Sequence, residues 1–245
     1  MSSSLYTVEL AAATAYIIVP ASYKKQKNFK WVMYHTGGGE WGCVITHRWN
    51  EKSGIIDRLL KNDFIVCSIS VGPDHWGRPE TYKPYQALYE YVRNNFTVAK
   101  KVSLLAQSMG GLTALAWAAK NSGKVKGLYG IYPLFDLESI LQMDELHKKK
   151  AVRAWGLNPG NSLLKLKKHN PVNMLGALAR KRIPVMQRHG LADKVVFYEQ
   201  NAAGVVRRYS ELGGTAKLIT LKKYGHETYR GFFNPGEIVK FFLSC

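Results

Sequence analysis

Hydrophobic and polar positions follow two different periods along the chain, and each change of period marks a predicted element. Short apolar runs rich in valine, isoleucine and aromatic residues predict β-strands. Longer segments with apolar residues three and four positions apart predict amphipathic helices between them. The strands are predicted at residues 6–10, 15–19, 31–35, 64–70, 101–106, 125–131, 183–189 and 217–221. The helices are predicted at residues 53–61, 84–96, 112–120 and 197–212 and from residue 234 onward.

The order of these elements predicts the α/β fold class. The first two strands are expected to form an antiparallel pair, and strands then alternate with helices. Such alternation is typical of a mainly parallel sheet, here of about eight strands, with helices on both faces. We find no internal repeat or linker, so residues 1–245 are expected to form one domain. Residues 134–182 break the alternation, and we interpret them as a short, basic, cap-like insertion over the sheet edge.

The composition is typical of a globular protein, and for the chemistry described below we predict no cofactor. Hydrophobic residues make up 46% of the chain and charged residues 21%. No apolar run reaches the roughly 20 residues needed to span a membrane. Residues 5–20 lack the positively charged n-region of a signal peptide and contain Glu9, so we do not interpret them as one. The three cysteines suggest neither a disulfide framework nor a metal site, and the compartment, cytoplasmic or exported within a larger assembly, stays open.

The net charge of +18 is concentrated in one part of the chain. Residues 146–192 contain no acidic residue. The basic residues of this span are Lys148, Lys149, Lys150, Arg153, Lys165, Lys167, Lys168, Arg180, Lys181, Arg182 and Arg188. Such a field attracts anionic polymers, although a merely solvated surface is an equal alternative. We find no nucleic-acid-binding motif, so no specific nucleic-acid binding is predicted. Because the insertion follows a strand end, residues 148–182 are expected to form a positive rim beside the active-site mouth.

Candidate chemistry begins at a serine between a predicted strand and a predicted helix. Ser108 lies between Ala106 and Gly110, in the pattern small-x-Ser-x-small. This pattern is typical of a nucleophile elbow, a turn too tight for bulky flanking residues. Such a turn exposes the hydroxyl beside the N-terminus of a helix, whose free N–H groups can stabilise an oxyanion. An ordinary strand-to-helix turn is the structural alternative.

A serine nucleophile needs a base and an acid that orients this base, and both follow in the expected order. Asp193 comes after the strand at 183–189, and His226 comes after the strand at 217–221. Both positions lie beyond strand ends, where an open parallel sheet collects its functional groups. Asp136, which follows the strand at 125–131, is an alternative acid. His189 also stands at a strand end, and we expect a structural role for it.

An oxyanion hole and an aromatic substrate contact complete the predicted site. The glycine run after His35 allows backbone N–H groups to approach a carbonyl oxygen closely, with Gly37 or Gly38 as the donor. The second donor is expected to be the Met109 N–H, directly after the serine. Trp76 and Trp41 are candidates for stacking on a substrate ring, with loop packing as the alternative. No cluster of histidine and acidic residues has metal-ligand spacing.

These motifs together resemble those of the α/β-hydrolase fold, nearest to small esterases and prolyl-oligopeptidase-like hydrolases. The resemblance extends from residue 31 onward and depends on residues 106–111, on His189-Gly190-x-x-Asp193 and on Gly225-His226. It implies that Ser108 is the nucleophile, His226 the base and then the acid, and Asp193 the orienting acid. Thr36 separates His35 from the glycines, which departs from the family's His-Gly-Gly-Gly pattern.

We therefore predict a serine hydrolase that cleaves carboxylic esters through an acyl-enzyme. A carboxylesterase or carbohydrate O-deacylase is favoured, with a small-molecule or polymer ester, neutral or anionic, as the substrate. A prolyl-oligopeptidase-like peptidase is an alternative, disfavoured because 245 residues leave no room for a gating domain. The other alternative is a catalytically idle hydrolase fold that binds an anionic polymer.

Overall fold

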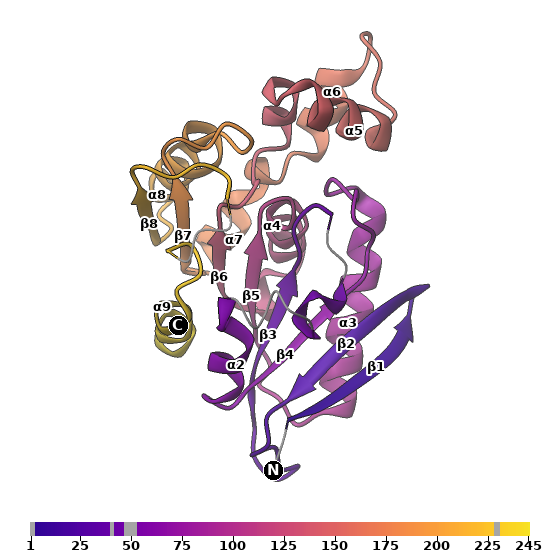
Figure 1. Ribbon diagram of the computed structural model, residues 1–245, viewed down its shortest axis with the longest axis vertical. Helices are drawn as coiled ribbons and strands as arrows, with labels where there is room; N and C mark the ends of the chain where they lie inside the picture. The colour runs from indigo at the N-terminus through magenta and orange to yellow at the C-terminus, as the bar shows by residue number, and fades with distance from the viewer. Residues whose placement is uncertain (1–2, 40–41, 47–52, 228–230) are drawn as a thin grey trace.

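A computed structural model describes residues 3–39, 42–46, 53–227 and 231–245 and shows one eight-stranded sheet (Figure 1). The strand order is β1-β2-β4-β3-β5-β6-β7-β8. The pairs β1–β2 and β2–β4 are antiparallel, and β3 to β8 run parallel to one another and to β4. The strands are β1 (Ser4–Leu10), β2 (Ala13–Val19), β3 (Lys30–His35), β4 (Phe64–Ile69), β5 (Val102–Gln107), β6 (Val125–Ile131), β7 (Val185–Gly190) and β8 (Ala216–Leu221).

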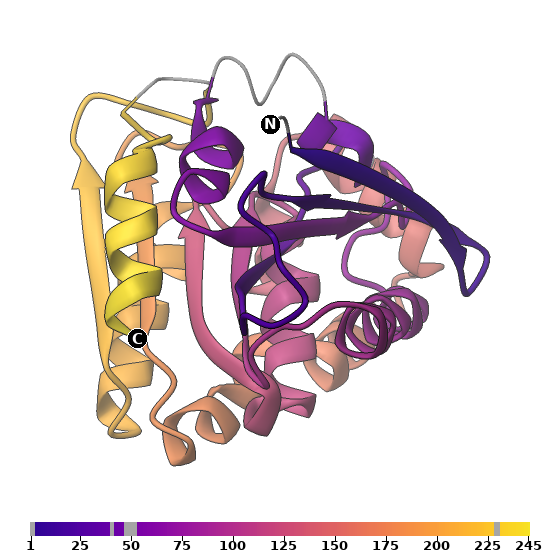
Figure 2. The same ribbon diagram turned by 90° about the horizontal axis from the view of Figure 1, so that it is seen from below.

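The sheet twists strongly along its width and carries helices on both faces. Figure 2 shows the N-terminal hairpin of β1 and β2 crossing the direction of the C-terminal strands. The longer helices are α2 (Ile55–Leu60), α3 (Tyr82–Asn95), α4 (Gly110–Lys120), α5 (Glu145–Trp155), α6 (Ser162–His169), α7 (Leu175–Arg180), α8 (Gly204–Glu211) and α9 (Pro235–Ser244). The predicted α/β fold is therefore confirmed. No helix in the described ranges is long and apolar enough to cross a membrane.

The core lies on the two faces of the central strands. Strands β4 and β5 are buried at every position, as expected for parallel strands that are covered on both sides. One apolar cluster packs α3, α4, α7 and α8 against one face, and a second packs α2 and α9 against the other. This rigid centre fixes the carboxyl ends of β5, β6, β7 and β8 at one edge of the sheet.

Residues 134–182 consist of two parts with different packing. Helices α5 and α6 lie beyond the carboxyl ends of the strands (Figure 1). Their residues Trp155 and Leu166 are buried in a third apolar cluster. Asp144 caps α5 by accepting hydrogen bonds from two N–H groups of its first turn, and Gly156 ends it in the left-handed conformation. Helix α7 instead packs on α4 and returns the chain to the opposite edge, where β7 begins.

One predicted helix is interrupted. The helix expected at 197–212 forms a π-helical turn at Glu199–Ala203 and becomes α-helical only at Gly204. The turn contains Asn201, which is fully buried and accepts hydrogen bonds from the backbone N–H groups of Phe135 and Asp136, both at 2.8 Å. Anchoring the loop after β6 in this way requires Asn201 to face the sheet, and the turn at 199–203 provides that direction.

Candidate active site

Ser108 occupies a strained turn between β5 and α4. Its φ angle is 45°, in the left-handed region that side chains other than glycine rarely adopt. The turn is held by the Ser108 carbonyl oxygen, which accepts hydrogen bonds from Leu134 N at 2.7 Å and Gly111 N at 2.9 Å. A Cβ atom on Gly110 would lie 2.2 Å from the His35 carbonyl oxygen. The small residue at position 110 is therefore required by the close approach of β3.

Ser108, His226 and Asp193 form a continuous chain of hydrogen bonds. The Ser108 Oγ atom lies 2.8 Å from His226 Nε2, and His226 Nδ1 lies 2.8 Å from Asp193 Oδ2. Because a carboxylate only accepts, Nδ1 carries the imidazole proton and Nε2 is free to accept the serine proton. The ring of Tyr132 packs edge-on against His226 with the ring centroids 4.5 Å apart. The chain can therefore transfer a proton from serine to histidine without moving a side chain.

Asp193 is held as an anion in a buried position. Its Oδ1 atom accepts hydrogen bonds from Val195 N at 2.9 Å and Val196 N at 2.8 Å, which is the reason the loop after β7 folds around it. Burial alone would raise the pKa of Asp193, but hydrogen bonds from His189 and His226 outweigh it and hold this pKa well below its ordinary value.

Two close backbone contacts bring the loops of Asp193 and His226 together. A Cβ atom on Gly190 would lie 2.1 Å from the Tyr224 carbonyl oxygen, and one on Gly225 would lie 3.2 Å from the Ala192 carbonyl oxygen. Ala192 N also donates a hydrogen bond to the Tyr224 carbonyl oxygen at 3.1 Å. Glycine at both positions lets the two loops touch through their backbones.

Asp136, the alternative acid, is engaged elsewhere. Its Oδ1 atom accepts hydrogen bonds from Asn170 Nδ2 at 2.6 Å and from Glu138 N at 2.9 Å, which caps the short 3₁₀ helix Leu137–Gln142. Burial raises the pKa of Asp136 above its ordinary value. The carboxylate that accepts the hydrogen bond from His226 Nδ1 is that of Asp193.

The glycine run lies against the elbow, and its members differ in their backbone partners. Gly39 N donates to the Pro73 carbonyl oxygen at 2.9 Å and is occupied. Gly38 lines the cavity at Ser108, and a Cβ atom there would lie 3.1 Å from Met109 Cε. The wall of this cavity includes Gly38 but not Gly37. Met109 follows Ser108 at the start of α4, where backbone N–H groups have no helical acceptor.

A cavity of about 380 Å³ opens at Ser108. Trp76 forms part of its wall, is 4% exposed, and accepts a hydrogen bond on its backbone oxygen from the Trp155 indole at 2.9 Å. Trp41, the other aromatic candidate, lies outside the described residues. The remaining lining residues are Gly38, Gly39, Asp74, Met109, Leu134, Met143, His147, Lys150, Val195, Val196 and His226.

Helix α5 contributes a polar wall, of which the sequence predicted Lys150, as part of the positive rim, but not His147. His147 and Lys150 stand three positions apart on one face of α5 and both line the cavity. Lys150 Nζ lies 3.7 Å from Asp74 Oδ1, which joins α5 to the loop after β4. His147 Nδ1 lies 2.6 Å from Asp144 Oδ2. Their three-residue spacing within the predicted insertion was the available signal.

The predicted positive rim is only partly present. Helices α5 and α6, which carry lysines, lie beyond the carboxyl end of β5, the strand that Ser108 follows (Figure 1). Residues 180–182 come directly before β7 and therefore lie at the opposite edge, because β7 runs parallel to β5. The prediction is wrong for these three residues, because α7 carries the chain back along α4.

Across the described ranges, no group of three or more histidine, cysteine, aspartate and glutamate side chains could hold a metal ion.

A serine on a strained strand–helix turn, linked through a histidine to a buried aspartate on a sheet of this order, defines a serine hydrolase of the α/β-hydrolase fold. The chain belongs to the prolyl oligopeptidase family, whose sequence model matches residues 71–243. No curated protein sequence matches the chain significantly.

Solved structures with the same fold include peptidases and an esterase. The acylaminoacyl peptidase of Pyrococcus horikoshii is 12% identical with a TM-score of 0.77, over 99% of this chain and 42% of the peptidase. A puromycin-hydrolysing peptidase of Mycobacterium tuberculosis is 16% identical with a TM-score of 0.77, over 98% of this chain and 38% of the peptidase. A ferulic acid esterase is 15% identical with a TM-score of 0.72, over 98% of this chain and 96% of the esterase. The chain thus spans about two fifths of the length of these two peptidases.

Proposed function

We propose that the protein hydrolyses carboxylic esters through an acyl-enzyme, as a carboxylesterase or a carbohydrate O-deacylase. The observation that carries this proposal is the hydrogen-bond chain from Ser108 through His226 to Asp193. Ser108 Oγ attacks the ester carbonyl carbon while His226 Nε2 takes its proton. Asp193 holds the imidazole in the required tautomer and stabilises the imidazolium.

The tetrahedral intermediate requires donors for its negatively charged oxygen. We assign the Met109 N–H and the Gly38 N–H to this role. Met109 directly follows the nucleophile at the start of α4, and Gly38 lines the cavity at Ser108. The imidazolium then returns its proton to the leaving alcohol, and the acyl group stays on Ser108. Water, activated by the same His226 nitrogen, releases the acid and restores the serine.

The cavity supports an ester with a compact acyl or aryl group. Its volume lies near the lower end of the range for small-molecule sites, and most of its wall is apolar, with Trp76, Leu134 and Met143 among its members. We propose that Trp76 contacts the substrate and that α5, within residues 134–182, acts as a cap. The likeness to a ferulic acid esterase, which extends through both chains, supports the same substrate class.

A peptidase is the second candidate, supported by the family and by the peptidases of the same fold. A peptidase that removes residues from the amino terminus needs an anionic group for the substrate ammonium. Asp74 is the one carboxylate among the described residues that line the cavity, and Lys150 already pairs with it. This pairing favours a neutral ester over a free amino terminus.

The test combines active-site labelling with a matched substrate panel. We expect a fluorophosphonate to label the wild-type protein and to leave Ser108→Ala unlabelled. Turnover of p-nitrophenyl esters and acetylated sugars is then compared with that of aminoacyl and N-blocked peptidyl p-nitroanilides. Ser108→Ala is expected to reduce kcat for the ester by a factor on the order of 10⁴ to 10⁶.

The outcomes separate the candidates. Higher kcat/KM for the anilides than for the esters would identify a peptidase. Near-normal turnover by folded Ser108→Ala would overturn the assignment of the nucleophile. A protein that is not labelled and turns over neither class would act as a binding module.

A further inference from the structure

Asp193 contacts two histidines, and only one of them belongs to the hydrogen-bond chain of Ser108. His189 Nε2 lies 3.3 Å from Asp193 Oδ2, the same oxygen that accepts the hydrogen bond from His226 Nδ1. The side chains of His189 and Asp193 are both completely buried. The second imidazole therefore acts on the carboxylate in a region without bulk water.

The tautomer of His189 follows from its other contact. His189 Nε2 lies 2.8 Å from the backbone oxygen of Val196, which can only accept a hydrogen bond. Nε2 therefore carries the proton, donates a hydrogen bond to this oxygen and lies 3.3 Å from Asp193 Oδ2. His189 Nδ1 has no hydrogen-bond partner among the described residues. An acceptor buried without a partner destabilises the fold, so the Nε2 contacts are the ones that explain a histidine here.

The surrounding structure holds the His189 ring in place. The ring of Tyr198 packs edge-on against it with the centroids 5.9 Å apart, and Tyr198 is anchored by its hydroxyl to Thr220 on β8 at 2.6 Å. Val196 also donates its N–H to Asp193 Oδ1 while its oxygen accepts from His189. His189, Val196 and Asp193 thus form a closed ring of contacts behind His226, made of two hydrogen bonds and the 3.3 Å approach of His189 Nε2 to Asp193 Oδ2.

We propose that His189 is a positioning residue that fixes Asp193 Oδ2 toward His226 Nδ1 and keeps it anionic during catalysis. His189 donates a hydrogen bond and exchanges no proton, so the covalent steps are unchanged. The inference depends on the proposed role of Asp193 in hydrolysis. It predicts a loss in kcat rather than in substrate binding, because His189 does not line the cavity.

The test compares two substitutions of similar size. His189→Leu removes the donor, whereas His189→Gln places an amide N–H near the position of Nε2. We expect His189→Leu to lower kcat about 10- to 100-fold, with little change in KM. This is the range observed in metal sites when a residue that orients a metal ligand through a hydrogen bond is removed. His189→Gln is expected to recover most of this loss. The low-field proton resonance of His226 Nδ1–H should shift in His189→Leu and return toward the wild-type position in His189→Gln.

Two controls test whether the variants are folded and whether the protein is a serine hydrolase, each independently of the role of His189. Thermal unfolding must show that both variants are folded, and fluorophosphonate labelling of the wild type tests the proposed function independently. In the Asp193→Asn background, His189→Leu should cause no further loss, because its effect acts through the carboxylate. Equal loss in the folded leucine and glutamine variants, an unchanged His226 resonance, or full additivity with Asp193→Asn would each overturn the proposal.

Discussion

At the scale of single residues, the site depends on which carboxylate faces His226. Two aspartates follow strand ends at this edge, and their order in the sequence does not distinguish them. Asp193 accepts a hydrogen bond from His226 Nδ1, whereas Asp136 caps a 3₁₀ helix and accepts a hydrogen bond from Asn170 Nδ2. The difference arises from the backbone N–H groups of residues 195 and 196, which turn the Asp193 carboxylate toward the histidine.

Asp193→Asn is expected to lower kcat roughly 10⁴-fold, because an amide donor facing Nδ1 selects the wrong imidazole tautomer. Asp136→Asn should keep its activity within a few-fold and most of its stability, because asparagine caps a helix about as well as aspartate does. Steady-state kinetics of both variants on one p-nitrophenyl ester tests this expectation. If Asp136→Asn were inactive and Asp193→Asn active, Asp136 would be the acid that orients His226.

His75, buried in the same loop as Trp76, is expected to make the free energy of unfolding depend on pH. Burial lowers the pKa of His75 to about 4, and its Nδ1 accepts a hydrogen bond from Gly77 N at 3.1 Å. Between pH 6.5 and 4 the unfolded chain binds a proton there that the folded chain does not. The free energy of unfolding should therefore fall as the pH falls through this window, by roughly 3 kcal/mol at most.

The measurement is denaturant unfolding at several pH values, with His75→Asn as the comparison. Asparagine keeps an acceptor for Gly77 N but does not titrate, so part of the slope should disappear. Burial also lowers the pKa of His35, so a second part of the slope should remain. An unchanged slope in His75→Asn would exclude His75 as its source.

At the scale of elements, the geometry of the site depends on close contact between the loops after β7 and β8. Gly190→Ala would place a Cβ atom 2.1 Å from the Tyr224 carbonyl oxygen. We expect it to displace the His226 loop, lowering kcat by at least 100-fold and destabilising the fold by about 1–3 kcal/mol. Gly123→Ala is the matched control, because a Cβ atom there meets no atom within 4 Å. Equal activity of the two variants would contradict the proposed contact.

The sequence predicted the elements whose signals are local and missed the features that depend on contacts between distant segments. The strand at 125–131 has the predicted bounds, and the last helix starts at Pro235 with Asn234 as its cap. The π-helical turn at 199–203 was missed because its cause is the anchoring of a loop more than 60 residues away by Asn201. The place of His147 in the cavity wall was missed because it depends on how α5 packs against the distant loop after β4.

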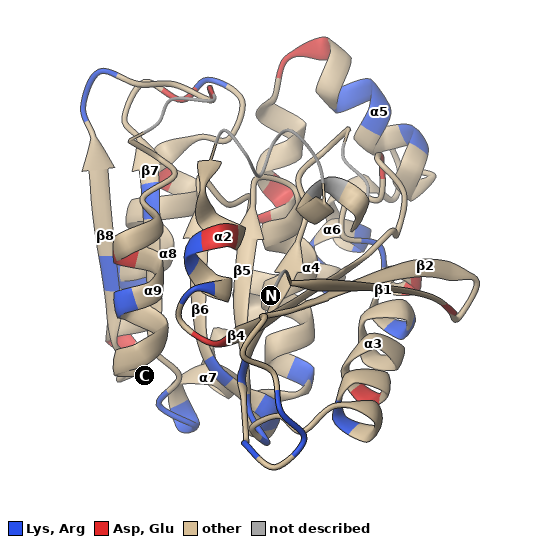
Figure 3. Ribbon diagram, turned by 60° about the horizontal axis from the view of Figure 1, so that its bottom comes forward, with Lys and Arg blue, Asp and Glu red and all other residues tan. Residues whose placement is uncertain are grey.

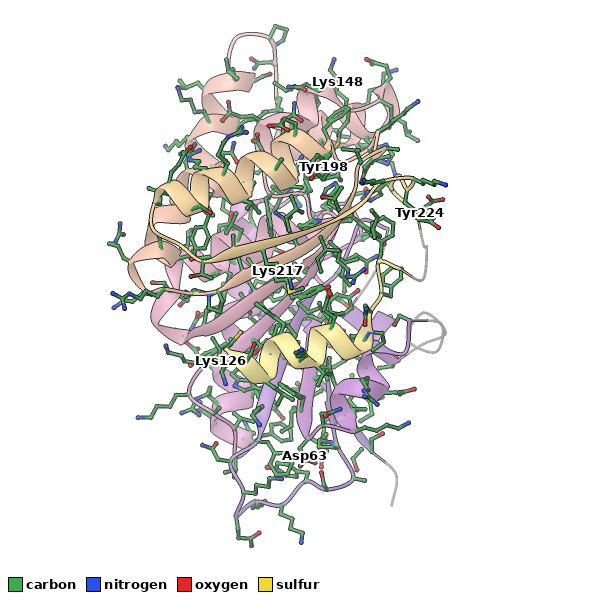
Figure 4. The ribbon with its side chains drawn as sticks, turned by 90° about the vertical axis from the view of Figure 1, so that its left-hand side faces the viewer. Asp63, Lys126, Lys148, Tyr198, Lys217 and Tyr224 are labelled. Atoms are coloured by element: carbon green, nitrogen blue, oxygen red, sulfur yellow. The ribbon has the colours of Figure 1, made fainter. Side chains whose placement is uncertain are left out.

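At the scale of the whole molecule, the positive charge divides between two ends of the sheet. Figure 3 shows basic segments on α5 at the end where Ser108 lies and others near α7 at the opposite end. In Figure 4, Lys148 of α5 lies near the top of the molecule, and Lys126, at the start of β6, lies well below it. The exposed basic residues of the first group include Lys149, Arg153, Lys167 and Lys168. This group is in a position to raise the local concentration of an anionic polymer ester near the cavity.

We therefore expect kcat/KM for an acetylated anionic polysaccharide to fall as ionic strength rises, because salt screens exposed charges beyond about 10 Å at 0.1 M. A small neutral ester should respond little. Lys149→Glu with Arg153→Glu should reduce kcat/KM for the polymer and not for the neutral ester. Arg180→Glu with Lys181→Glu makes the same change in charge at the opposite edge and should affect neither substrate. If the two double variants respond alike, the charge acts through the net field of the protein, and α5 has no particular part in capturing the substrate.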